Sequence, residues 1–418
     1  MALSKYRALL MGAGLVGALA LGTSTAWAVK DGPVEDPIRV VKVPKGAPIV
    51  VGFYTVLSGP DVGQGLDPYR GAQIAAEDAG NKLLGHPVKF QAEDDQCNAE
   101  GGQTAATKLA ANKQVVVALG SNCSPASLPA APILWKAGIP DIATGAASPK
   151  LTDVKTRGPG YEGFTRVIYN ALFEGEALAE WAKNTKKFDS VAAIHDGTPY
   201  VQGLVEAFVN KFKSMGGKVV AVEAIGAQDV DMRPMLTRLV TTKPQMVFFP
   251  TYIAATAHIV TQAKEIEGFK NVLLMGSDNV ADKNFLQVAG KSAVGLTIVS
   301  PPLDTESQGG PYKELLVKYK KKFGEDPNTP WSPYGYDAYV MAAKAIEKVA
   351  VQDKDGTLYI PISKLQEAII GTKGMKGITG DITCRPNGDC AQFRAVFYQF
   401  TDSNPETFEI GKNPKTMM

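Results

Sequence analysis

The chain has few of the residues that most often mark a metal site or a catalytic centre. Among its 418 residues there are three histidines and four cysteines. It contains no G-x-S-x-G elbow, no H-E-x-x-H motif and no Walker A loop. An excess of one charge is also lacking, because 44 Lys and Arg residues balance 42 Asp and Glu residues. A chain without a basic excess is poorly suited to neutralise phosphates, so we expect no nucleic acid partner. We also expect no metal and no cofactor.

The remaining composition is that of an ordinary folded protein. Hydrophobic residues make up 45% of the chain and charged residues 21%, which excludes an intrinsically disordered or collagen-like chain. A chain of this length predicts two or three domains, each large enough to bury its own core.

The N-terminus has the three parts of a secretory signal peptide. Lys5 and Arg7 form a positive segment, residues 8–22 are uncharged and apolar, and Ala26-Trp27-Ala28 is a small-x-small cleavage site. A membrane anchor is the alternative, but the stretch is rich in Gly and Ala and shorter than a bilayer core requires. We therefore expect residues 1–28 to be removed after Ala28. Residues 29–46 are polar and contain three prolines, which predicts a flexible leader.

The four cysteines lie in the part of the chain that would be exported. Cys97, Cys123, Cys384 and Cys390 allow three disulfide connectivities, and their spacing favours Cys97–Cys123 with Cys384–Cys390. The second pair would close a small hairpin turn. A zinc site is the alternative, but it would need CxxC pairs or nearby histidines, and the histidines are far apart in sequence.

Continuous apolar runs alternate with segments of helical periodicity along the chain. Strands are expected at 49–54, 88–92, 115–119 and 139–143, and again at 191–194, 219–224, 246–249 and 272–275. This alternation predicts two α/β units, each with a parallel sheet covered by helices on both faces. Three helices are expected between residues 312 and 370. The strand-like segments from Ile378 onward could complete both units by crossing back.

Ligands of open parallel sheets bind beyond the carboxyl ends of the strands. That rule selects the loops 57–64, 120–127, 144–148, 195–200, and 250–252 with 276–279. Four are rich in Ser, Thr, Gly and Asn, and the helix N-termini behind them favour an anionic group such as a carboxylate. Asp278 offers the negative charge that suits an ammonium, and Tyr200 and Tyr252 could cover the organic part of the ligand. We expect a small-molecule site that holds both signs of charge.

Each of these residues also has a simpler explanation. Ser124 and Ser148 precede prolines and could be turn residues or helix caps, and Asp278 could cap a helix that begins near Asp282. The aromatic cluster at 331–339 is more typical of a core than of a ligand site. The position of the loop residues at strand ends nevertheless favours a site.

Six short motifs follow the expected strands in order. They are VLSGP at 56–60, EDDQC at 93–97, GSNCS at 120–124, AASPKLT at 146–152, LMGSD at 274–278 and GL at 295–296. These motifs resemble those of the periplasmic substrate-binding proteins of ABC importers, in the branched-chain amino acid binding (type I) family. The resemblance extends from about Ile49 to the last strands.

The resemblance implies an α/β fold of two Rossmann-like lobes, joined by three crossovers, that close on a ligand. It implies an N-lobe of residues 47–166 and 302–378, and a C-lobe of residues 167–301 and 379–418. It also implies that Cys97 and Cys123 form the family's N-lobe disulfide. The protein would be a periplasmic monomer that delivers its ligand to an ABC permease.

The same resemblance implies roles for individual residues. Ser124 would hold a ligand carboxylate, together with Ala146 and with Ala147 or Ser148. Asp278, which is shorter than the glutamate common in the family, would bind the ammonium, and Tyr200 and Tyr252 would line the other wall. Gln64 stands where an aromatic residue often covers the site. Relatives also bind amides, urea and aromatic acids, so the ligand stays open within this group.

Two other functional classes are alternatives to a transport receptor. A ligand-sensing module that docks on a signalling receptor would have the same fold. A secreted α/β enzyme would need a catalytic constellation, for which His195 beside Asp196 is the one candidate in a site loop. The leading expectation is a non-enzymatic receptor for a small polar solute.

Overall fold

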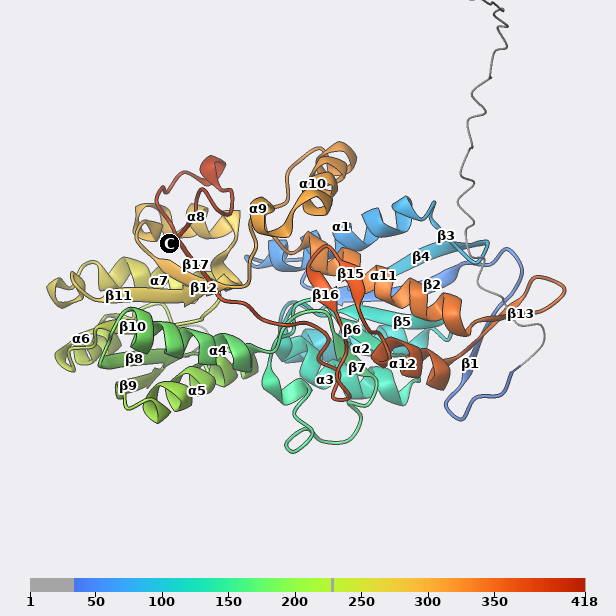
Figure 1. Ribbon diagram of the computed structural model, residues 1–418, viewed down its shortest axis with the longest axis horizontal. Helices are drawn as coiled ribbons and strands as arrows, with labels where there is room; N and C mark the ends of the chain where they lie inside the picture. The colour runs from blue at the N-terminus through green and yellow to red at the C-terminus, as the bar shows by residue number, and fades with distance from the viewer. Residues whose placement is uncertain (1–33, 227–228, 418) are drawn as a thin grey trace, which may run out of the picture.

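The computed structural model describes residues 34–226 and 229–417, which fold into two lobes (Figure 1). The signal peptide expected at residues 1–28 lies outside the described residues. No helix in the described ranges combines the length and the apolar character that a bilayer crossing requires.

The first lobe is built on a six-stranded sheet with the order β3-β4-β2-β5-β6-β7. Its strands are β2 (Ile49–Thr55), β3 (Lys82–Leu83), β4 (His86–Asp94), β5 (Val115–Gly120), β6 (Asp141–Ala143) and β7 (Phe164–Arg166). All neighbours are parallel except β3 and β4. The central strands β2 and β5 are buried along their whole length. Strands buried on both faces read as continuous apolar runs, which is why the sequence revealed these two clearly.

Helices cover both faces of this sheet. The helices of this lobe are α1 (Val62–Asp78), α2 (Ala99–Ala111), α3 (Ser124–Lys136), α9 (Thr305–Gln308), α10 (Gly310–Phe323), α11 (Ser332–Val349) and α12 (Ile362–Ile370), of which α10 packs on α1. Helix α1 packs on α11, and α2 packs on α3. Phe53 of β2 joins the core on the α1 side, whereas Tyr54 joins a separate core with Leu109 and Leu134 on the α2–α3 side. Successive residues of the strand therefore serve opposite faces.

The second lobe repeats this architecture on a seven-stranded sheet with the order β18-β17-β12-β11-β10-β8-β9. Its strands are β8 (Ser190–His195), β9 (Lys218–Ala224), β10 (Met246–Phe248), β11 (Leu273–Ser277), β12 (Thr297–Ser300), β17 (Val396–Gln399) and β18 (Lys415–Thr416). The first five are parallel, and the last two pair antiparallel at one edge. Its helices are α4 (Ala171–Glu180), α5 (Pro199–Ser214), α6 (Arg233–Thr241), α7 (Ile253–Ala263) and α8 (Lys283–Ala289).

Three crossings of the chain join the lobes. The chain leaves the first sheet after β7 and enters α4, returns to the first lobe after β12, and reaches β17 in the last crossing. Figure 1 shows the red C-terminal segment running from the first lobe to β17, next to the end of the chain. The α/β fold with two lobes and three crossovers is therefore confirmed.

The last crossing comes later than the expected boundary at residue 378. Strands β15 (Met375–Gly377) and β16 (Gly380–Ile382) form a separate hairpin on the first lobe. The buried carboxylate of Asp337 in α11 accepts hydrogen bonds from the backbone of Ile378 and Thr379, at 2.9 Å each. These bonds hold residues 378–379 to the first lobe, and Cys390 N still donates to the Arg166 carbonyl. The first lobe thus keeps the chain to about residue 390.

Of the flexible leader expected at residues 29–46, residues 29–33 lie outside the described residues, and the described part contains a strand. Val40–Val43 form β1, which pairs antiparallel with β14 (Leu358–Pro361), and β14 pairs in turn with β13 (Val351–Gln352). Val41 and Val43 are buried on either side of the exposed Lys42, the alternation of a half-buried strand. Prolines on both sides of this short run concealed it in the sequence.

The spacing-favoured disulfides, Cys97–Cys123 and Cys384–Cys390, are both present. The second closes the expected turn, in which Thr383 N donates to the Cys390 carbonyl. Gly388 is required inside this turn, because its φ is +99° and a Cβ there would lie 2.4 Å from the Phe164 carbonyl oxygen. The zinc alternative is wrong, since all four cysteines are consumed in disulfides.

Candidate functional site

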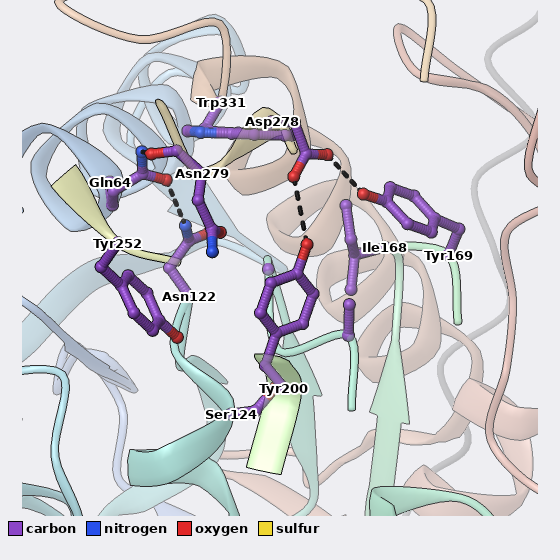
Figure 2. Close-up of a pocket in the computed structure, with 12 residues that line it drawn as sticks. Gln64, Asn122, Ser124, Ile168, Tyr169, Tyr200, Tyr252, Asp278, Asn279 and Trp331 are labelled. Carbon is purple, nitrogen blue, oxygen red and sulfur yellow. Dashed lines mark hydrogen bonds between the residues drawn. The ribbon is translucent and has the colours of Figure 1, made fainter. Parts of the chain in front are cut away.

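A pocket lies between the two lobes, at the carboxyl ends of their parallel strands (Figure 2). Residues from both lobes and from the crossings line it: Gln64, Asn122, Ser124, Gly145, Ala147, Ile168, Tyr169, Tyr200, Tyr252, Asp278, Asn279 and Trp331. None of these side chains is cationic. The pocket therefore has its polar groups where the strand-end rule predicts them.

One end of the pocket presents the start of helix α3. Ser124 is the first residue of this 13-residue helix, so the unpaired N–H groups and the positive end of the helix dipole lie beside it. The Ser124 Oγ accepts a hydrogen bond from Ser148 N at 2.9 Å. Because that bond occupies a lone pair and leaves the hydroxyl proton, Ser124 can still donate to a ligand. A carboxylate is the group that this end would stabilise.

The opposite wall carries a buried carboxylate. Asp278 begins a short 3-10 turn directly after β11 and is 3% exposed. The Tyr169 hydroxyl donates to its Oδ2, and the Tyr200 hydroxyl lies 3.4 Å from its Oδ1 (Figure 2). Burial raises the pKa of Asp278 to about 7, although the two phenols act to lower it. The capping alternative does not hold, because Asp282 itself caps α8 through Asn284 N at 2.8 Å.

A second acid lies behind Asp278. Glu174 of α4 is 0% exposed, and its Oε2 lies 3.0 Å from the Tyr169 hydroxyl, within hydrogen-bond distance. Its other oxygen, Oε1, has no hydrogen-bond partner. Burial raises the pKa of Glu174 well above its usual range, and the nearby Asp278 charge raises it further. Within the described ranges no salt bridge reaches either acid.

Two direct hydrogen bonds connect the lobes across the pocket. The Gln64 Nε2 donates to the Asn279 carbonyl at 2.9 Å, and the Ser148 Oγ donates to the Pro199 carbonyl at 3.1 Å. The Asn122 Nδ2 lies 3.4 Å from the Gln64 Oε1, so Gln64 is held from both sides. With these bonds formed, the structure represents the closed arrangement of the lobes.

The loop at 144–148 is held from behind by a buried arginine. Arg166 of β7 is 0% exposed and donates through Nη1 to the carbonyls of Ala146 (3.1 Å) and Ser148 (2.9 Å). Its Nε donates to the Asp389 Oδ1 at 2.7 Å, and its Nη2 donates to the Thr152 hydroxyl at 2.7 Å. Asp389 lies in the turn closed by Cys384–Cys390. The second disulfide thus fixes the residue that neutralises Arg166.

The structure brings together six of the eight ligand-contacting residues expected from the sequence. Gln64, Ser124, Ala147, Tyr200, Tyr252 and Asp278 line the pocket, whereas Ala146 and Ser148 do not. The Ala146 carbonyl accepts from Arg166, and the Ser148 hydroxyl bonds to the other lobe, so both groups are already engaged. Gly145 and Ala147 line the pocket at this loop instead.

Sequence reasoning missed the residues of the site that come from the first crossing. Ile168, Tyr169 and Glu174 follow β7, a short strand that was not expected, so the strand-end rule was never applied there. The apolar run Val167-Ile168-Tyr169 is the signal that could have found this segment. Trp331 was assigned to a core cluster; it is 4% exposed, yet it also lines the pocket, and its Nε1 has no partner.

His195 and Asp196 do not line the pocket. The His195 Nδ1 lies 3.2 Å from Gly197 N, and the Asp196 Oδ1 accepts from Thr198 N at 2.9 Å. Each side chain thus stabilises its own turn, and the two are not bonded to each other in the structure. The pair therefore lacks the geometry of a base and its orienting acid.

The chain is similar in sequence to known binding proteins. A family model described as periplasmic binding protein matches residues 48–404. A leucine-specific-binding protein of Salmonella typhimurium is 25% identical over 382 residues, which cover 90% of this chain and 94% of that protein. A Leu/Ile/Val-binding protein of Escherichia coli is 28% identical over 255 residues, which cover 60% and 67% of the two chains.

Solved structures share the fold. A leucine binding protein from Thermotoga maritima superposes with a TM-score of 0.75 at 24% identity, covering 85% of this chain and 96% of that one. A solute binding protein from R. palustris, in complex with benzoate, superposes with a TM-score of 0.71 at 17% identity, covering 88% and 94%. With the family model spanning most of its length, the chain belongs to the periplasmic binding protein family.

Proposed function

We propose that the protein is a solute-binding receptor that captures a small amino acid between its lobes and delivers it to an ABC permease. The observation that carries this proposal is the polarity of the pocket. Its Ser124 end, at the start of α3, suits a carboxylate. Its Asp278 wall is anionic, and no cationic side chain among the described residues lines the pocket to neutralise it. A ligand with a carboxylate and an ammonium supplies both missing partners.

The aromatic lining serves the remainder of the ligand. Tyr200, Tyr252 and Trp331 offer ring surface to an organic body, and the unpartnered Trp331 Nε1 can donate a hydrogen bond to it. The two named relatives bind leucine or Leu, Ile and Val, which supports an amino acid ligand. The fold neighbour that holds benzoate makes an aromatic acid the alternative, but such a ligand would leave Asp278 without a cation.

The location and the lobe boundaries belong to the same proposal. We propose that export to the periplasm removes residues 1–28 and that the chain acts there as a monomer. We assign residues 40–166 with 302–390 to the N-lobe, because β1 pairs with β14, and residues 167–301 with 391–418 to the C-lobe. Mass spectrometry of the protein recovered from the periplasm tests the cleavage, which is expected directly after Ala28.

The test of the ligand is a binding experiment on the purified, ligand-stripped mature protein. Thermal shift and titration calorimetry would compare L-leucine, L-alanine, benzoate, 4-hydroxybenzoate and acetamide. At 100 times its dissociation constant a ligand stabilises the folded protein by about 2.7 kcal/mol, so a true ligand gives a clear shift. Binding of an amino acid is the expected outcome. Binding of benzoate alone would keep the receptor role and overturn the amino acid assignment.

Variants then locate the ligand. Asp278→Asn is expected to weaken binding of the amino acid by at least about tenfold, or 1.4 kcal/mol, because it removes the partner of the ammonium. Asp196→Asn is the matched control, since Asp196 follows β8 of the same sheet but does not line the pocket. Equal affinities of the two variants would remove Asp278 from the site.

A further inference from the structure

Glu174 and Asp278 form a cluster whose hydrogen bonds cannot all be made by the protons of the two tyrosines. The Tyr169 hydroxyl contacts both the Glu174 Oε2 and the Asp278 Oδ2. The Tyr200 hydroxyl lies 3.4 Å from the Glu174 Oε2 and 3.4 Å from the Asp278 Oδ1. Four oxygen–oxygen contacts therefore share two phenolic protons, because each hydroxyl carries a single proton. If both acids were ionised, two contacts would set a lone pair against a carboxylate oxygen.

The surroundings provide no cation that could relieve this conflict. Both carboxyls are buried, and no Lys, Arg or His of the described residues donates to either. The groups that bear on Asp278 and Glu174 are the Tyr169 and Tyr200 phenols, with Tyr252 and Tyr334 within range of the Asp278 charge. A pair of ionised acids in this position would be strongly unfavourable, and like charges that are buried together retain a proton.

We infer that Glu174 is a positioning residue of the ligand site, whose protonated carboxyl donates to the Tyr169 hydroxyl so that Tyr169 can donate to Asp278. The third proton turns one of the two repulsive contacts into a hydrogen bond. The resulting chain, from Glu174 to Tyr169 to Asp278, fixes the orientation of the Asp278 carboxylate towards the pocket. The site then presents one negative charge instead of two.

The net charge of the pocket wall formed by Asp278 and Glu174 determines which class of ligand binds. This consequence rests on the proposed function. A wall with one negative charge matches a ligand with a single ammonium, such as a neutral amino acid. A wall with two negative charges would instead favour a second cation, as in L-lysine or a diamine. Neutral amino acids are therefore expected to bind at least about tenfold more tightly than L-lysine at pH 8.

Infrared spectroscopy of the ligand-free protein tests whether the Glu174 carboxyl is protonated. Protein labelled with 13C at the glutamate carboxyl is compared with unlabelled protein at pH 8, where Asp278, with its pKa of about 7, is mostly ionised. We expect one protonated-carboxyl carbonyl band that shifts with the glutamate label and is absent in Glu174→Gln. The buried Asp141 and Asp282, whose pKa values burial also raises, can add bands that shift only with labelled aspartate, so the glutamate label is the one that decides. A spectrum without a band that shifts with the glutamate label would overturn the inference.

Binding of L-leucine to variants of Glu174 shows whether the site needs a proton donor or a negative charge at this position. Glu174→Leu keeps a similar side-chain volume but cannot donate to Tyr169, so the dissociation constant should rise at least tenfold. Glu174→Gln restores a donor without a charge and should recover most of that loss. The control is Glu180→Gln on the same helix, because Glu180 is exposed. A loss in Glu174→Gln as large as in Glu174→Leu would show that the site needs the charge. If no amino acid binds the wild-type protein, the proposed function fails, and the infrared result still decides the role of Glu174.

Discussion

Removing the carboxylate of Asp389 should damage both the stability and the ligand site. Arg166 and Asp389 form a buried ion pair with an Nη2–Oδ1 distance of 2.6 Å, and their side chains are 0% and 4% exposed. Asp389→Ala leaves the Arg166 guanidinium buried without its counter-charge. Breaking a buried pair in this way typically costs about 3–5 kcal/mol, far more than an average substitution.

The assay is urea unfolding followed by circular dichroism, combined with ligand titration. The matched control is Asp381→Ala, which breaks the exposed Lys376–Asp381 pair on the neighbouring hairpin and should cost at most about 1 kcal/mol. Because Arg166 also holds the carbonyls of Ala146 and Ser148, Asp389→Ala should weaken amino acid binding by about tenfold, or 1.4 kcal/mol.

A double variant separates the two effects. Arg166→Met with Asp389→Leu removes both charges, and replacement of a buried pair by apolar side chains is often neutral for stability. Stability should therefore return to near the wild-type value. Affinity should stay low, because the hydrogen bonds to the loop carbonyls are still missing. A loss below about 1 kcal/mol in Asp389→Ala, or full recovery of affinity in the double variant, would refute the reasoning.

Three further predictions follow from the same contacts. Replacement of Cys384 and Cys390 by serine opens their loop and should lower the free energy of unfolding, measured with urea, by about 2 kcal/mol in the chain-entropy model. The affinity for the ligand, measured by calorimetry, should fall as well, because Asp389 lies inside that loop. Gln64→Ala removes the bond to the Asn279 carbonyl and should weaken binding by about threefold to tenfold by calorimetry, whereas the exposed Gln103→Ala should leave affinity unchanged. Because burial raises the pKa of Asp278 to about 7 and an ammonium needs the ionised carboxylate, the affinity for an amino acid should rise with pH from 5 to about 7 and then level off. Asp278→Asn should abolish this slope, and a flat profile in the wild-type protein would contradict the assignment.

The main elements of the fold could be predicted because burial on both faces leaves a direct record in the sequence. The runs at β2 and β5 have no charged residue to break them, and each is followed by a segment of helical period. Strands β1, β7 and β12 were not expected. They are three or four residues long, and β1 lies among prolines, so too few residues repeat to reveal a period.

The site was predictable to the extent that it lies at strand ends. Ser124 follows a strand of the first sheet, and Tyr200 and Asp278 follow strands of the second, all of which the sequence revealed. Parallel topology brings each residue to the carboxyl ends of its own sheet, where it lines the pocket. The assignment of the loop at 144–148 was less accurate. Whether a carbonyl there faces the ligand or Arg166 depends on Asp389, more than 200 residues further along the chain. Nothing in the local sequence carries that information.

Tyr169 illustrates a different reason why part of the site was missed. It lies in the first crossing between the lobes, and its ring packs against Phe393 of the last crossing, with 4.6 Å between ring centroids. Its hydroxyl meanwhile contacts Asp278 in the pocket. Rotation of the lobes must bend these crossings, so a side chain anchored there senses both closure and the charge of the ligand wall. Because three separate segments meet at the crossings, the role of Tyr169 follows from the topology of the whole chain and from no single motif.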